Sequence, residues 1–282
     1  MKALITSFFV GLALLISSSC AGDKNADEVN IIYLHHSTGE VIWEGDLAQT
    51  LPEAMEKRPR VKSQLPVLFS YYNKENSTSY SIVESVFPKA EIYGWNNYPF
   101  DYYNIWVKNA GEKAFLKEPT LEMLTDQYDI IIFKHCFPVS NILSDNEVAD
   151  INSDRKSLQN YILQYLALRD KMHQFPENKF ILFTGAVHVQ AFISEEEAIR
   201  AREFHNWVTE VWDQPDDNIF LWDLYELQTE GDLYFQEEHA VSSTDSHPNK
   251  EFAGRASNLL FNRIIDVIEN DGMTTDLVGN KI

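Results

Sequence analysis

Cysteine and basic residues are both scarce in this chain. It contains two cysteines, Cys20 and Cys136, so a disulfide-stabilised scaffold is excluded. Lysine and arginine number 23 against 43 aspartates and glutamates, which gives a formal net charge of −20. Such a surface repels phosphate backbones and anionic headgroups, so we expect no nucleic-acid binding. The acidity fits a neutral or cationic substrate, or serves only to keep an exported protein soluble.

Patterns that would indicate a metalloprotein or a repeat protein are also missing. The eight histidines include no His-Glu-x-x-His pattern, and the two cysteines are far apart. His35 and His36 are adjacent, so on a strand their side chains point to opposite faces. We therefore expect no metal and no other cofactor. Repeats and Pro/Gly/Ser-rich linkers are absent after residue 27, so about 250 residues are expected to form one domain.

The N-terminal residues have the composition of a secretory signal. Lys2 is followed by an almost continuous apolar run over residues 3–16 and then by Ser17-Ser18-Ser19-Cys20. The run is too short for a membrane-spanning helix. Small residues directly before a cysteine resemble a bacterial lipobox, in which Cys20 becomes the lipidated first residue. The alternative is an ordinary cleaved signal in which the cysteine occurs by chance.

The lipobox resemblance predicts a signal peptide over residues 1–19, then a lipidated cysteine and polar tether over residues 20–27. It implies an exported bacterial lipoprotein of the cell envelope that meets the membrane through its lipid anchor only. Ala21 follows the cysteine where an aspartate would retain a lipoprotein at the inner membrane. That position is similar to the sorting signals for an outer membrane.

Apolar segments after residue 27 alternate between strand-like and helix-like patterns. Short apolar runs predict strands over residues 29–34, 66–72, 129–133, 180–183 and 219–222. Helical spacing predicts helices over residues 41–55, 158–172, 198–212 and 252–268. Buried strands that alternate with helices predict an α/β fold, a flavodoxin-like three-layer sandwich with a central, mostly parallel sheet.

Polar residues that end the predicted strands would meet at one edge of this sheet, where ligands of open α/β folds bind. The first strand runs into His35-His36-Ser37-Thr38-Gly39, and Asp245-Ser246-His247-Pro248 stands just before the last helix. A serine hydroxyl needs a base to take its proton, and that base needs a carboxylate to orient it. The two blocks therefore predict an acyl-transfer site.

In this site we expect Ser37 to be the nucleophile, His247 the base and Asp245 the carboxylate that orients the base. The backbone N–H groups of Ser37 and Gly39, at a helix N-terminus, are candidate oxyanion donors. Ser37 has an alternative role as a helix N-cap, which Thr38 would fill equally well. The alternative for His247 is a histidine in a surface turn.

The two blocks resemble those of the SGNH (GDSL-like) hydrolase superfamily. Its first block is a hydrophobic strand followed by Gly-Asp-Ser, where this chain has His35-His36-Ser37. Its last block is Asp-x-x-His-Pro, where this chain has Asp245-Ser246-His247-Pro248, one residue shorter. The resemblance implies a flavodoxin-like domain over residues 28–282 and metal-independent ester hydrolysis by a serine and a histidine. Many members deacetylate carbohydrates. The chain also resembles a group of bacterial lipoproteins that share these two blocks.

The chain departs from the family pattern in two places. The family's Gly-x-Asn-Asp block should follow the strand that ends near Phe133, but no Gly-x-Asn occurs there. Asn141 is the candidate that takes over the oxyanion role. Thr244 stands where the family has its aspartate, so a Ser-His dyad is the alternative to a triad with Asp245. Cys136 is expected to be a small buried residue, because no base for a cysteine nucleophile is evident.

An aromatic stretch over residues 93–106 is a candidate for substrate contact. Flat rings beside amides suit the apolar faces and hydroxyls of sugars. The alternative for these rings is that they pack a long crossover segment onto the core. The alternative for His135 is that it is a buried imidazole. The candidates for substrate contact are His36, Trp95, Asn96, Asn97 and His135.

These observations predict a serine esterase that hydrolyses small acyl esters, including O-acetyl groups on carbohydrate. A small-molecule or glycan ester is then the expected substrate. The alternative is a non-catalytic envelope lipoprotein of the same fold that binds glycan or a protein partner. An acyltransferase that uses the same serine is a third hypothesis. The oligomeric state does not follow from the sequence.

Overall fold

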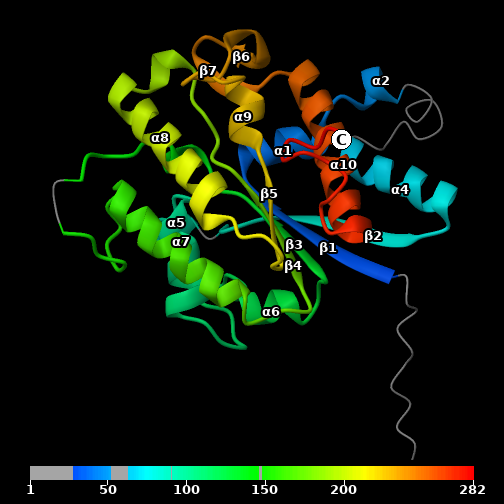
Figure 1. The fold of residues 1–282 in the computed structure, drawn as a ribbon, viewed down its shortest axis with the longest axis horizontal. Coiled ribbons are helices and arrows are strands. Elements are labelled where there is room, and N and C mark those ends of the chain that lie inside the picture. The colour runs from blue at the N-terminus through cyan, green and yellow to red at the C-terminus, as the bar shows by residue number, and fades with distance from the viewer. Residues whose placement is uncertain (1–27, 52–62, 90, 146–147) are drawn as a thin grey trace, which may run out of the picture.

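The computed structural model describes residues 28–51, 63–89, 91–145 and 148–282 (Figure 1). The predicted signal peptide, the lipidation site at Cys20 and the tether lie outside the described residues, as do residues 52–55 of a predicted helix. Within the described ranges, no helix combines the length and the apolar character needed to cross a membrane.

A five-stranded parallel sheet forms the middle layer, with strand order β2-β1-β3-β4-β5. The strands are β1 (Glu28–His35), β2 (Ser79–Val86), β3 (Ile130–Phe133), β4 (Lys179–Phe183) and β5 (Ile219–Trp222). β3 is buried along its whole length, as expected for a strand covered on both faces. The chain order reverses between β1 and β3, so the topological switch point lies beside the end of β1.

Helices cover both faces of the sheet, and each face has its own core. Ile31 and Tyr33 of β1 face one cluster of buried residues, whereas Ile32 and Leu34 face the other, because side chains alternate along a strand. Figure 1 shows α4 and α10 on one side of the molecule and α7 and α8 on the other. The predicted flavodoxin-like three-layer α/β sandwich is confirmed.

The first core lies under α1 (Ser37–Glu44), α4 (Gln64–Asn76) and α10 (Lys250–Asn270). The second lies under α5 (Pro99–Tyr102), the π-helical turn η2 (Tyr103–Lys108), α7 (Leu158–Met172) and α8 (Glu195–Trp207). Smaller elements are α2 (Leu47–Thr50), η1 (Glu91–Tyr93), α6 (Leu121–Thr125), η3 (Phe137–Val139), η4 (Gln190–Phe192), η5 (Val208–Trp212), α9 (Leu224–Thr229), η6 (Glu237–His239) and the hairpin β6 (Ala240–Ser242) with β7 (Asp245–Pro248).

The strand predicted over residues 66–72 is wrong, because these residues belong to α4. Leu65 and Phe69 are four residues apart and both are buried, which is the spacing of one helix face. The sheet position is filled instead by β2, which begins three residues after α4 ends. Its half-exposed residues, rich in serine, lack the apolar run that marked the other strands.

The helix predicted over residues 41–55 starts earlier and is divided. α1 begins at Ser37 and ends at Glu44, and the shorter α2 begins at Leu47. Gly45 between them has φ +59, and a Cβ there would lie 2.4 Å from Oε1 of Gln64. A left-handed backbone and a close approach both favour glycine at this position.

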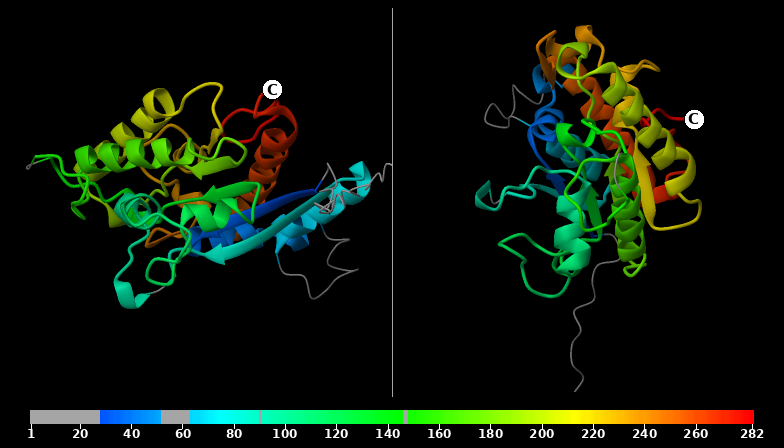
Figure 2. Two further views of the ribbon diagram at one scale, coloured as in Figure 1. Left: turned by 90° about the horizontal axis from the view of Figure 1, so that it is seen from below. Right: turned by 90° about the vertical axis from the view of Figure 1, so that its left-hand side faces the viewer.

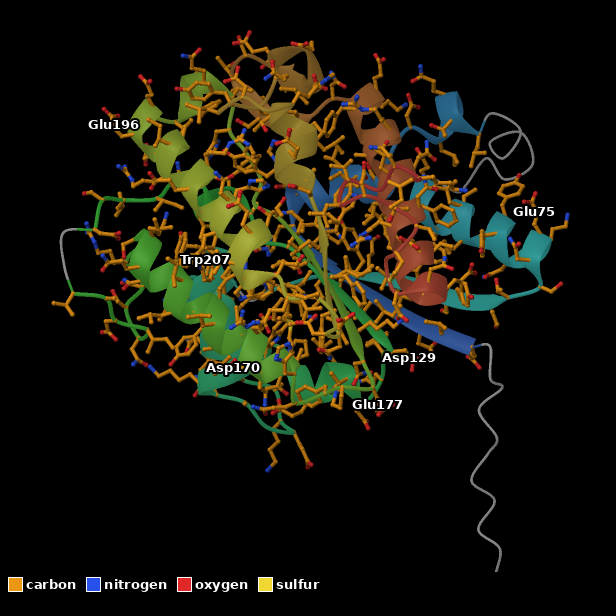
Figure 3. The ribbon with its side chains drawn as sticks, viewed as in Figure 1. Glu75, Asp129, Asp170, Glu177, Glu196 and Trp207 are labelled. Carbon is orange, nitrogen blue, oxygen red and sulfur yellow. The ribbon has the colours of Figure 1, made fainter. Side chains whose placement is uncertain are left out.

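Carboxylates are spread over the whole surface. Figure 3 labels Glu75 on α4, Asp170 on α7, Glu177 before β4 and Glu196 on α8, and all four residues are exposed. Exposed carboxylates therefore occur on both helical layers of the described part of the molecule.

Candidate active site

Loops from three distant parts of the chain meet beyond the carboxyl end of β1. Ser37 directly follows this end of the sheet, and its Oγ lies 3.8 Å from Sγ of Cys136 in the loop after β3. The next residue, Phe137, packs edge-on against the His247 ring, with centroids 5.3 Å apart and planes at 89°. β7, which carries His247, also packs against α1. The Cys136-Phe137 dipeptide thus contacts both predicted catalytic residues.

Asp245 and His247 form a close pair within β7. Oδ1 of Asp245 lies 2.7 Å from the ring Nδ1 of His247 and 3.0 Å from its backbone nitrogen. The backbone N–H and then the ring of His247 hold the pKa of Asp245 below its usual range. With Nδ1 bound to the carboxylate, the ring carries its available lone pair or proton at Nε2.

Ser37 has no hydrogen bond to His247 in the structure, although both residues are described; its hydroxyl contacts Cys136 instead. Catalytic hydrogen bonds are often long in a free enzyme and shorten when substrate binds. Cys136 is half-buried and belongs to the surroundings of Ser37. The expectation of a small buried residue at Cys136 is thus wrong, because its side chain is partly open and contacts the Ser37 hydroxyl.

The first turn of α1 carries the expected oxyanion donors. The leading N–H groups of a helix have no partners within it, and Ser37 is the first residue of α1. The N–H of Gly39, however, donates to the carbonyl of His36 at 2.7 Å. A Cβ at Gly39 would lie 2.4 Å from Cβ of His35. Gly39 is thus required for close packing, and its occupied N–H gives no support to the predicted oxyanion role.

Asn141 belongs to a hydrogen-bond network that reaches Ser246 of β7 through His188. Its Oδ1 lies 3.3 Å from Nε2 of His188, and Nδ1 of His188 lies 3.3 Å from Oγ of Ser246. The His188 ring also stacks on Phe137, with centroids 4.7 Å apart. Burial lowers the pKa of His188 to about 4, so this ring is neutral at neutral pH. His188 was not predicted, because it follows β4 without any recognisable motif.

Two buried ionisable side chains end β3. Lys134 and His135 are 0 % and 1 % exposed, and their side-chain nitrogens have no hydrogen-bond partner among the described residues. Burial lowers the pKa of Lys134, and it lowers that of His135 to about 3. The His135 ring packs against Tyr102 with centroids 4.4 Å apart. Contrary to its predicted role in substrate contact, His135 lies in the core without access to the surface.

The other predicted substrate contacts lie on the β2 side of the site. Nε2 of His36 lies 2.6 Å from the carbonyl oxygen of Pro88. Asn97 is buried and its carbonyl accepts the N–H of Cys136 at 2.8 Å, which ties its loop to the site. Trp95 is half-buried and packs against Phe115, with centroids 6.4 Å apart.

The loop around Asn97 is shaped by one buried carboxylate. Oδ2 of Asp101 accepts the N–H of Asn96 at 2.6 Å and that of Asn97 at 2.7 Å. Burial raises the pKa of Asp101 to about 7. Asn96 is exposed to solvent, whereas Asn97 is buried and has a structural role.

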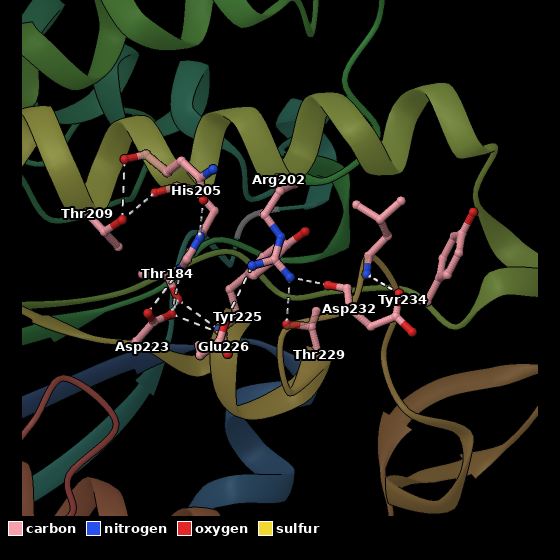
Figure 4. A network of polar contacts seen from close by, with 12 residues as sticks. Thr184, Arg202, His205, Thr209, Asp223, Tyr225, Glu226, Thr229, Asp232 and Tyr234 are labelled. Carbon is pink, nitrogen blue, oxygen red and sulfur yellow. Dashed lines mark hydrogen bonds and ion pairs between the residues drawn. The ribbon is translucent and has the colours of Figure 1, made fainter.

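A second histidine–aspartate pair lies inside the molecule, under α8 (Figure 4). Nε2 of His205 lies 2.9 Å from Oδ1 of Asp223, which also accepts the hydroxyl of Thr184 at 2.8 Å. The adjoining cavity measures about 10 Å³, which is room for one water molecule. Because no substrate fits there, this pair joins β4, β5 and α8 and does not form a second active site.

The described residues contain no group of three or more histidine, cysteine or carboxylate side chains that could hold a metal ion. A hollow of about 420 Å³ is lined by residues that include Val41 and Glu44 of α1 and Pro248 of β7. Ser37, Asp245 and His247 are not among its lining residues.

No known protein family, curated protein or solved structure matches this chain.

Proposed function

We propose that this protein is a serine ester hydrolase of the SGNH type, with Ser37, His247 and Asp245 as its catalytic residues. The observation that carries the proposal is the 2.7 Å contact of Asp245 with the His247 ring, next to a dipeptide that touches both His247 and Ser37. This arrangement supplies a base with an oriented ring near a serine at a strand end.

The chemistry follows from these roles. Nε2 of His247 takes the hydroxyl proton as Oγ of Ser37 attacks the acyl carbon, and Asp245 stabilises the imidazolium that forms. The backbone N–H of Ser37, the first residue of α1, stabilises the developing negative charge at the helix N-terminus. His247 then gives the proton to the leaving alcohol, and water hydrolyses the acyl-enzyme by the same steps.

The proposed substrate is a neutral acyl ester, such as an O-acetyl group on a carbohydrate. A chain with net charge −20 disfavours polyanionic substrates. We further propose that the enzyme acts in the cell envelope of a bacterium as a lipoprotein anchored through Cys20, which the composition of residues 1–20 supports.

Labelling by a fluorophosphonate serine probe tests the proposal. The full chain in detergent is compared with Ser37→Ala, His247→Ala and the matched control Ser243→Ala, an exposed serine on the neighbouring hairpin. We expect wild type and Ser243→Ala to be labelled and the other two to lose labelling while keeping the wild-type circular dichroism spectrum. Absence of labelling in folded wild type, together with no hydrolysis of acetyl esters, would contradict the proposal.

A second candidate is an envelope protein that binds glycan without catalysis. It is favoured by the contact of the Ser37 hydroxyl with Cys136 in place of His247. This candidate predicts that wild type and Ser37→Ala bind an acetylated glycan equally well and that neither releases acetate over hours.

A further inference from the structure

The two edges of the central sheet are covered differently. At β5, the N–H of Asp223 donates to the carbonyl of Leu277 at 2.8 Å, and Nε of Arg263 donates to the carbonyl of Leu221 at 3.0 Å. The C-terminal segment and α10 therefore cover this edge. At β2, no strand among the described residues pairs with the outer side. Figure 2 shows β2 (cyan) along the outer margin of the sheet in its left-hand view.

Three hydrogen bonds establish which β2 residues face outward. The N–H of Phe87 donates to the carbonyl of His35 at 3.1 Å, toward β1. Asn73 of α4 takes up the opposite side at Tyr80, where its side chain accepts the N–H at 3.0 Å and donates to the carbonyl at 2.8 Å. Peptide groups of alternate residues face opposite sides of a strand. Even-numbered residues of β2 thus face away from the sheet.

Beyond Tyr80, the outward backbone groups are those of Ile82, Glu84 and Val86. Within the described part of the chain, their N–H groups have no acceptor outside the strand, and the Val86 carbonyl has a weak contact with Oγ of Ser85 at 3.4 Å. These alternate donors and acceptors form a template for one more strand. Asn73 covers only the beginning of the edge.

Among the features that protect sheet edges, this part of β2 has one charged residue, Glu84, and no bulge, proline or lysine. Its register with β1 continues over all eight residues. Val83 and Val86 are each 43 % exposed. Unpaired edge strands with exposed valines tend to pair with another chain. The outer edge of β2 therefore has the character of a binding surface for a partner.

The charge beside the edge indicates the chemistry of that partner. Glu84 is 41 % exposed, and its Oε2 lies 2.8 Å from Nε2 of His35. Glu40 and Glu44 are exposed on the neighbouring α1. Burial first, and then these two carboxylates, raise the pKa of Glu84. A cationic strand would relieve this repulsion. A second copy of the chain would instead bring two acidic edges together, at a net charge of −20 for each copy.

We propose that the outer edge of β2, from Ile82 to Val86, binds an extended lysine- or arginine-bearing segment of a partner protein by strand addition. The segment's backbone pairs with the outward groups of Ile82, Glu84 and Val86. Its basic side chains face Glu84 and its apolar ones cover Val83. The proposal does not depend on the esterase activity.

The test uses the full chain and a peptide of alternating lysine and valine, about eight residues long. We expect saturable binding that slows amide exchange of Ile82, Glu84 and Val86 at least about tenfold. The exchange of Val83, whose N–H faces β1, changes little. Two control peptides separate the contribution of charge from that of strand pairing. Alternating lysine and proline keeps the charge but removes every second backbone N–H and fixes φ at the prolines, and alternating glutamate and valine reverses the charge. Both should bind at least about tenfold more weakly.

Variants of exposed residues locate the site. Val83→Lys adds a repelling charge, with Val83→Thr as the matched neutral control, and Val86→Pro removes one outward N–H, which an edge position tolerates. Val83→Lys and Val86→Pro should each weaken binding about tenfold, and Val83→Thr less than about twofold. Equal binding of the lysine–proline peptide, or no effect of either variant, overturns the proposal. A dimer that protects the same amides without peptide assigns the edge to a second copy and also overturns it.

Discussion

One oxygen of Asp245 binds His247 twice, at 3.0 Å through the backbone N–H and at 2.7 Å through the ring Nδ1. The first contact shapes the turn of β7, and the second fixes the ring tautomer with Nε2 as the free nitrogen. Both groups are partly open to solvent, since the side chains of His247 and Asp245 are 35 % and 43 % exposed. Among the described carboxylates, Asp245 is the one that contacts His247 and orients its ring.

Asp245→Asn should lower kcat/KM for an acetyl ester by about 10²- to 10⁴-fold, because an amide favours the wrong ring tautomer. The fold should remain, since the amide oxygen still accepts the backbone N–H. Steady-state hydrolysis and circular dichroism measure the two effects. Wild-type turnover in Asp245→Asn would instead indicate that Ser37 and His247 work without a third residue.

Modification of Cys136 should block Ser37. Sγ lies 3.8 Å from the Ser37 Oγ, so a bulky thiol adduct would occupy the space needed by the acyl group. We expect a maleimide to reduce fluorophosphonate labelling of wild type more than about tenfold. Cys136→Ser should be labelled without being sensitive to maleimide. Sensitivity that persists in Cys136→Ser would show that the reagent acts elsewhere.

Gly39→Ala should destabilise the protein by about 1–3 kcal/mol, the usual cost of overpacking. The added Cβ would lie 2.4 Å from Cβ of His35 and 2.9 Å from Oη of Tyr33. Urea unfolding measures the loss. Glu40→Ala, an exposed change in the same helix turn, serves as the control and should alter the free energy of unfolding by less than about 0.5 kcal/mol.

Stability should fall in acid partly because of His188. Its pKa in the folded protein is about 4, compared with about 6.5 in an unfolded chain. Between these values the unfolded chain binds the proton and the folded protein does not, so stability decreases as pH falls through this window. Replacing His188 with glutamine should reduce the loss between pH 6.5 and 4 by about 2 kcal/mol. Parallel pH curves for wild type and His188→Gln would refute this account.

The buried strands could be predicted because each one is a short apolar run that is recognisable from its own residues. β3 and β5 are runs of large apolar residues bounded by polar ones, and such runs have few structures other than a strand covered on both faces. β2 could not be predicted in this way, since an edge strand exposes half of its residues and has no apolar run. The residues of α4 resemble a strand in their apolar composition. Only the spacing of the buried Leu65 and Phe69, four residues apart, indicates a helix.

The candidate site was predictable in its chemistry but not in its contacts. Ser37, Asp245 and His247 were recognisable from residue type, order and the blocks that contain them. Their neighbours were not, because Cys136 and His188 carry no motif and gain their positions from the loops after β3 and β4. The opposite case is His135, whose place at a strand end resembles that of a site residue. Its side chain lies in the core because the chain beyond β3 packs it against Tyr102 and Tyr165.

By itself the sequence determined the α/β alternation, the parallel sheet and the residues that end its strands, because hydrophobic periodicity acts over a few neighbouring residues. Only the tertiary structure decided which of those residues meet. Ser37 and Cys136 are 99 positions apart, and His188 reaches Ser246 from 58 positions away. It also decided that β5 is covered by the C-terminal segment, whereas no strand among the described residues pairs with the outer side of β2. Such contacts depend on the packing of the whole chain and cannot be predicted from the pattern of neighbouring residues.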